Sequence, residues 1–141
     1  MKTLILDDDE FRHEYYTEIY TDHEVSHAWK YSDFCSSLVR GSPWDLIHLD
    51  HDLGDLVAGD TYTDGWGKLR EFNGQHASQK LCELPDELLP KKVIIQSVNP
   101  EGAKSMLQML QRRGVAVTWQ PFSGWAGESL QEMAPSDMEH K

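Results

Sequence analysis

Two short apolar runs, each followed at once by acidic residues, constrain the fold of this chain most strongly. The first run spans residues 4–6 and the second spans residues 46–49; the polar residues that follow them are Asp7, Asp8, Asp9 and Glu10, and then Asp50, His51 and Asp52. Apolar runs of this length are typical of strands buried in a sheet. Open α/β sheets place their ligands at the carboxyl ends of the strands. If the two strands are neighbours, their acids converge on one small volume.

Strand-like runs alternate with amphipathic segments along the rest of the chain. Strands are expected at residues 2–6, 24–29, 44–49, 93–95 and 115–119, and helices at residues 10–20, 32–40, 68–81, 101–113 and 123–133. Residues 54–66 predict a long Gly/Asp/Thr-rich loop, and such loops are often functional. The alternation predicts a three-layer α/β fold, with a doubly wound, five-stranded parallel sheet in the flavodoxin-like order 2-1-3-4-5. In that order the first and third strands are adjacent, and Asp7, Asp8, Asp50 and Asp52 meet.

The length and the aromatic content predict a single packed domain. The chain has 141 residues, with five Trp and five Tyr to supply apolar area for a core. We expect one α/β domain over residues 1–134 and a polar, frayed tail over residues 135–141.

The charge balance limits the classes of partner. The net charge is -11, from 13 basic and 24 acidic residues. Duplex DNA and anionic membranes require a basic surface, so neither is an expected partner. Acids follow directly after Leu6, no apolar stretch is long enough to span a membrane, and Cys35 and Cys82 form no CxxC pair, so a cytoplasmic location is expected. The composition does not define the oligomeric state.

Carboxylates that converge at the end of a sheet repel one another unless a cation neutralises them. Hard oxygen ligands suit magnesium, manganese or calcium. The sequence therefore predicts a metal-centred acidic pocket. The ordinary alternative is that acids after the first strand are solvated residues favoured at a helix N-terminus.

The pattern from Leu4 to Pro121 resembles the receiver domain of two-component response regulators. In that resemblance Asp7 and Asp8 match the acidic pair that holds a metal ion, Asp50 matches the phosphoacceptor, and Ser97 matches the residue that contacts the phosphoryl group. The receiver lysine that precedes a proline after the last strand is replaced here by Gln120. The missing lysine weakens the expectation of ordinary phosphoswitch signalling.

A closer resemblance is to a bacterial and phage branch described as cyclic-phosphate-processing receiver domains. It rests on the string at residues 49–54, on Gly65, and on the serine, asparagine, proline and glycine at Ser97, Asn99, Pro100 and Gly102. Gln96 stands where that branch has a histidine. The resemblance implies a small phosphorylated or cyclic-phosphate substrate, such as a cyclic nucleotide or an RNA end with a 2′,3′-cyclic phosphate.

These residues predict specific roles in phosphate chemistry. Asp7, Asp8 and Asp50 are the expected ligands of a divalent cation, Mg²⁺ or Mn²⁺, with Asp52 as an optional or outer partner. His51 is the candidate general acid or base, because its ordinary pKa lies near neutral pH. Asp50 and Asp52 complete the expected catalytic group. Ser97 and Asn99 are expected to hold phosphate oxygens.

Each of these assignments has a structural alternative. Asp52 can cap a turn, His51 can be an ordinary hydrogen-bonded residue, and the segment 97–100 is also a normal helix-capping string. His48, inside an apolar run, is better explained as a satisfied core residue. Three functions therefore compete: a metal-dependent phosphoesterase for cyclic phosphates, a signalling receiver phosphorylated on Asp50, and a catalytically silent binding module.

Overall fold

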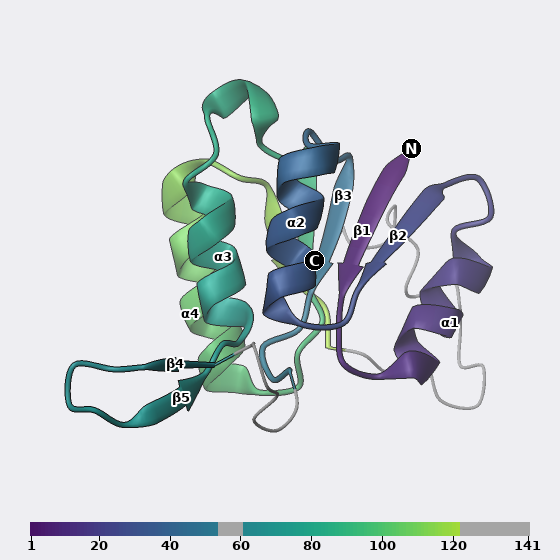
Figure 1. Cartoon of the computed structure of the whole chain (residues 1–141). Helices are drawn as coiled ribbons and strands as arrows, with labels where there is room; N and C mark the ends of the chain where they lie inside the picture. Colours follow the sequence, from purple (N-terminus) through teal and green to yellow (C-terminus); the bar gives the residue numbers. More distant parts are fainter. Residues whose placement is uncertain (54–60, 122–141) are drawn as a thin grey trace.

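A computed structural model describes residues 1–53 and 61–121 of the chain. Its main sheet has five parallel strands in the order β2-β1-β3-β6-β7 (Figure 1), which confirms the predicted flavodoxin-like order. The strands are β1 (Lys2–Leu6), β2 (Glu24–Ala28), β3 (Leu46–Leu49), β6 (Lys92–Ile95) and β7 (Val117–Trp119). In the register Leu6 lies opposite Leu49, so β1 and β3 end together.

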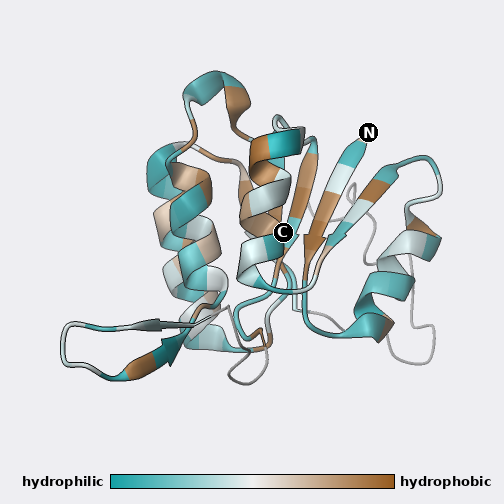
Figure 2. Ribbon diagram, in the orientation of Figure 1, coloured by the Kyte–Doolittle hydropathy of each residue, from teal (hydrophilic) through white to brown (hydrophobic). Residues whose placement is uncertain are grey.

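The described helices cover both faces of this sheet. They are α1 (Glu10–Ile19), α2 (Tyr31–Gly41), α3 (Gly74–Cys82) and α4 (Pro100–Arg113), with a short 3₁₀ turn at Asp86–Leu88. Successive strand residues point to opposite faces. Leu4 and Leu6 therefore pack with α2, α3 and α4, whereas Ile5 packs with the tyrosines of α1. The brown, hydrophobic colour of β1 and β3 in Figure 2 marks these central strands of the core.

The segment between β3 and α3 differs from the sequence expectation. The predicted helix over residues 68–81 is wrong at its start, because β4 (Thr61–Thr63) and β5 (Leu69–Glu71) form an antiparallel hairpin that projects from the domain (Figure 1). Asp64 closes the turn by accepting hydrogen bonds from the Trp66 and Lys68 amides, and Gly67 has a φ of 75°. The helix begins only at Gly74, where the Asn73 side chain caps it by accepting from the Gln75 amide.

The last predicted helix (123–133) and the tail (135–141) lie outside the described residues, as does the segment 54–60. The domain boundary at residue 134 therefore stays a prediction. Within the described ranges, no helix has both the length and the apolar character that a membrane span requires.

Candidate metal and phosphate site

Three carboxylates from the ends of β1 and β3 form one cluster. One oxygen from each of Asp7, Asp8 and Asp50 lies within 4.8 Å of the others. The sheet positions two of them directly, because the Asp7 amide donates to Ala28 O (3.2 Å) and the Asp50 amide donates to Leu6 O (3.1 Å). The structure thus brings together the three acids that the sequence named as metal ligands. Whether they bind a metal stays a prediction.

Burial makes this cluster electrostatically strained. Asp7 is fully buried and Asp50 is 5% exposed, whereas Asp8 is exposed. Burial, and then the neighbouring Asp7 charge, raise the pKa of Asp50 to about 8. Burial likewise raises the pKa of Asp7 and, with the charge of Asp7, that of Asp8. Ionisation of all three carboxylates is therefore unfavourable by itself, and a bound cation would offset this cost.

Arg12 is a member of the site that the sequence reasoning missed. Its Nη1 lies 3.1 Å from Asp7 Oδ2 and 3.5 Å from Asp50 Oδ2, and its Nε lies 3.5 Å from Asp9 Oδ2. The sequence spacing could have indicated this position. Arg12 follows the capping residue Asp9 by three positions, so the two side chains lie on the same side of α1.

The donor set of the cluster fits a hard divalent cation. Its three carboxylates offer oxygen ligands, the chemistry that magnesium and manganese prefer. One guanidinium supplies one positive charge against three potential negative charges. Asp7, Asp8 and Asp50 are therefore the residues that would hold the ion.

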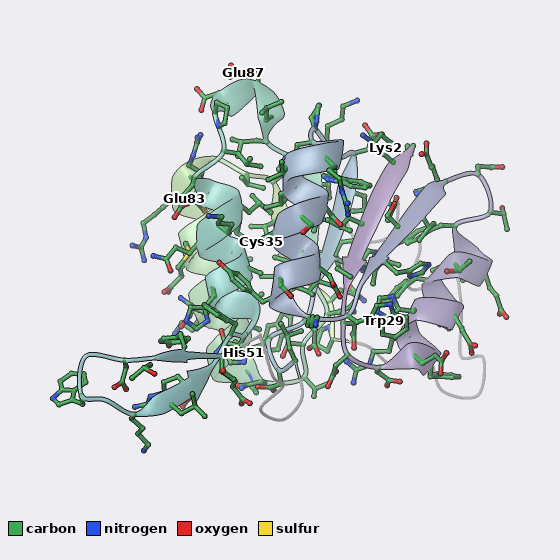
Figure 3. The ribbon with its side chains drawn as sticks, viewed as in Figure 1. Lys2, Trp29, Cys35, His51, Glu83 and Glu87 are labelled. Atoms are coloured by element: carbon green, nitrogen blue, oxygen red, sulfur yellow. The ribbon has the colours of Figure 1, made fainter. Side chains whose placement is uncertain are left out.

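His51 follows Asp50 in the chain, and its side chain packs against the first turn of α4. A Cβ at Gly102 would lie 2.4 Å from His51 Cδ2, so the imidazole packs directly on the glycine backbone. Figure 3 shows His51 near the base of the β4–β5 hairpin. Its Nδ1 lies 2.9 Å from Asp52 Oδ1. An ionised carboxylate only accepts hydrogen bonds, so Nδ1 carries the proton and Nε2 of the neutral ring is the basic nitrogen.

Asp52 stands apart from the acid cluster. Its side chain is 67% exposed, and its described partner is His51 rather than Asp7 or Asp8. The arrangement places Asp52 as an orienting partner of the imidazole. Its predicted part as an outer partner of a metal stays a prediction.

Ser97 and Asn99 shape the turn that leads from β6 into α4. Asn99 caps the helix by accepting from the Gly102 amide (3.0 Å), and Ser97 Oγ accepts from the Asn99 amide (3.0 Å). The capping alternative from the sequence is therefore confirmed for Asn99. Its side-chain amide and the Ser97 hydroxyl still have hydrogens to donate, so phosphate binding by both residues stays a prediction.

A buried hydrogen-bond chain supports Asp7 from inside the core. Gln96 Nε2 donates to Asp7 Oδ2, so Gln96 Oε1 accepts from His48 Nδ1 (2.8 Å). His48 Nε2 then accepts from the Tyr20 hydroxyl (2.8 Å). Burial lowers the pKa of His48 to about 3, which keeps the ring neutral. This bears out the expectation that His48 is a satisfied core residue.

The start of α3 is packed tightly against the same backbone, which gives a testable prediction. A Cβ at Gly74 would lie 2.1 Å from Asp50 O and 2.8 Å from His51 Cα. We expect Gly74→Ala to lower the free energy of unfolding by about 1–3 kcal/mol, because backbone must move to admit the methyl group. Urea unfolding measures this. Gly65→Ala is the control, since nothing lies within 4 Å of its Cβ; equal losses in both variants would contradict the packing argument.

The parallel sheet and its acid cluster define a receiver domain of the response-regulator type. A receiver domain from Methylobacillus flagellatus is similar at 16% identity, with a TM-score of 0.62 over 97% of this chain and 98% of that one. The N-terminal domain of a response regulator/sensory box/GGDEF protein from Carboxydothermus hydrogenoformans has a TM-score of 0.61 at 15% identity, over 99% and 92% of the two chains. The Mn²⁺-bound form of response regulator Rcp1 has a TM-score of 0.58 at 14% identity, over 94% of this chain and 85% of that one.

The chain belongs to the family of cyclic-phosphate processing receiver domains. The family model matches residues 2–112, which is more than half of the chain. A search of the curated proteins found no match. The family resemblance drawn from the sequence is therefore confirmed.

Proposed function

We propose that this domain is a divalent-metal-dependent phosphoesterase that hydrolyses cyclic phosphates. The observation that carries the proposal is that His51, whose imidazole is oriented by Asp52, follows Asp50 in the chain, and Asp50 is one of two buried members of a cluster of three carboxylates. The family description supports the substrate class. An aspartate cluster alone is equally suited to signalling, whereas the His51–Asp52 pair that follows Asp50 in the chain adds a group that can move protons.

The residues of the site divide the work of hydrolysis. A divalent cation held by Asp7, Asp8 and Asp50 would act as a Lewis acid on a phosphoryl oxygen. His51 Nε2 takes the proton from the attacking water or returns one to the departing alkoxide, while Asp52 holds Nδ1–H in place. Water then opens the ring at phosphorus and leaves a phosphomonoester and a hydroxyl group.

The N-terminus of α4 supplies the anion-binding part of the site. Pro100, its first residue, has no N–H and the Gly102 amide is capped by Asn99, so the helix dipole and the Glu101 amide are what would favour a negative ligand here. Ser97 and Asn99 flank this start and have donors for phosphate oxygens. The substrate phosphate would therefore lie between this helix end and the acid cluster.

A substrate panel tests the proposal. The wild-type protein should be incubated with 2′,3′- and 3′,5′-cyclic nucleotides and with RNA ending in a 2′,3′-cyclic phosphate, each with Mg²⁺ or Mn²⁺. We expect at least one to yield a phosphomonoester, read by ³¹P NMR, and chelation to stop the reaction. No product from any substrate with either metal would overturn the hydrolase and favour the binding module.

A second candidate is a signalling receiver phosphorylated on Asp50. It is favoured by the position of Asp50 at the end of β3, beside Asp7 and Asp8, in a receiver fold. Exposure to a small acyl-phosphate donor with Mg²⁺ separates the candidates. An aspartyl-phosphate at Asp50, detected by mass spectrometry, supports signalling, and its absence together with cyclic-phosphate turnover supports the hydrolase.

The end of the last strand gives a prediction for this second candidate. Gln120 follows β7, and its amide donates to Ile95 O (2.8 Å), next to the strand that leads into Ser97. Its side chain is neutral and cannot form an ion pair with a phosphoryl group. We expect Gln120→Lys to raise the yield or lifetime of any phospho-Asp50, followed by mass spectrometry over time. A long-lived phospho-Asp50 in the unmodified chain would contradict this.

A further inference from the structure

We propose that Arg12 is an exchangeable counter-cation: its guanidinium holds the position between Asp7 and Asp50 until a divalent ion binds, and then contacts the substrate phosphate. This inference rests on the proposed function, since it assumes the metal site. In this proposal Arg12 supplies the positive charge toward the phosphate that the receiver lysine would supply at the position of Gln120.

The geometry places Arg12 where a shared cation belongs. Nη1 contacts both Asp7 Oδ2 (3.1 Å) and Asp50 Oδ2 (3.5 Å). Two cations that share these oxygens repel each other strongly in a buried site. The guanidinium must therefore leave this position when a divalent ion is bound by the same carboxylates.

The side chain has room and a pivot for this movement. Arg12 is 21% exposed, so one side of it faces solvent rather than the core. Its Nε is anchored separately to Asp9, whose side chain is 42% exposed and lies outside the cluster. Nη1 can therefore leave Asp7 while Nε stays near Asp9.

The charge balance explains what the displaced guanidinium does. Three ionised carboxylates carry three negative charges, and a divalent ion with Arg12 balances them. A phosphodiester anion then meets a neutral site. Without Arg12 it would meet one net negative charge, and among the described residues only Arg12 forms an ion pair with Asp7 or Asp50.

The test measures two binding constants in Arg12→Gln, Arg12→Lys and the control Arg40→Gln, whose arginine is exposed near the end of α2. Calorimetry gives the Mg²⁺ affinity at low ionic strength. Titration with inorganic phosphate at saturating Mg²⁺, followed through the Gly102 amide resonance, gives the anion affinity. Neither readout depends on turnover.

We expect opposite changes in Arg12→Gln: Mg²⁺ binding about 3- to 10-fold tighter, and phosphate binding about 10-fold weaker, the effect of losing a charged hydrogen bond. Arg12→Lys should return both constants toward wild type, and Arg40→Gln should change neither. A misfolded variant would bind both Mg²⁺ and phosphate more weakly than the wild type. Weaker or unchanged Mg²⁺ binding in Arg12→Gln, or unchanged phosphate binding, would overturn the exchange. Absence of Mg²⁺ and Mn²⁺ binding by the wild type would instead refute the metal site itself.

Discussion

Replacing Asp50 by asparagine is expected to stabilise the metal-free protein at alkaline pH and to remove its response to divalent ions. The pKa of Asp50 is about 8 in the folded protein, above the ordinary aspartate value of 3.8. A raised carboxyl pKa favours folding below the unfolded value and loses that contribution as pH rises through the folded value. The wild-type free energy of unfolding should therefore fall between about pH 4 and pH 8.

The asparagine variant should show a smaller decline, because it has no buried charge to create at this position. We expect it to exceed the wild type by about 1–3 kcal/mol at pH 9 in the presence of chelator. Urea denaturation at pH 5, 7 and 9 measures this difference. Asp52→Asn, at an exposed carboxylate, is the matched control and should follow the wild type.

The same variant separates metal binding from general ionic effects. A ligand at 100 times its dissociation constant stabilises the folded state by about 2.7 kcal/mol. Mg²⁺ should therefore raise the wild-type melting temperature and leave that of Asp50→Asn unchanged. Equal shifts in both proteins would show that the ion binds elsewhere.

The largest expected loss of activity follows from replacing His51 by alanine. Removal of a general acid or base costs about 10²–10⁴ in rate. The imidazole packs on Gly102 at the surface of the site and is not part of the buried core clusters. His51→Ala should therefore fold and bind Mg²⁺ normally, yet cleave any responsive cyclic phosphate far more slowly in steady-state kinetics.

Three further variants place this loss in context. Asp52→Asn should lower kcat less than His51→Ala, because it removes only the partner that orients the ring. Ser97→Ala and Asn99→Ala should mainly raise KM, since both residues are expected to hold phosphate oxygens. Full activity in His51→Ala, with activity lost in Asp50→Ala, would make His51 a structural residue and require another base.

The central sheet and its acids were predictable from the sequence because local pattern and tertiary position agree there. Leu4 to Leu6 and Leu46 to Leu49 are buried on both faces, as strands covered by helices must be. Parallel pairing of the two strands then brings Asp7 and Asp50 to the same edge of the sheet. This placement follows from the backbone register and does not depend on side-chain rotamers. The N-cap of α4 at Asn99 and the glycine at its C-terminal end were equally predictable from the sequence. Gly114 takes the left-handed conformation.

The rest depends on interactions that a one-dimensional pattern does not contain. Lys68 to Glu71 has no alternation strong enough to mark a strand, and the Asp64 turn determines the hairpin through three-dimensional hydrogen bonds. The place of Arg12 depends on a long side chain that bends back over the first turn of α1. His51 depends on two glycines, Gly74 and Gly102, that lie close to it only after folding.

The hydrogen-bond chain behind Asp7 has a consequence for proton traffic. Tyr20, His48 and Gln96 each donate toward Asp7, so the chain has one polarity from end to end. A glutamine amide fixes such a chain but does not relay protons as an imidazole can. The core side of the pocket therefore offers no path for proton transfer. Protons consumed or released in the reaction would have to be exchanged with solvent through His51, whose side chain is partly exposed.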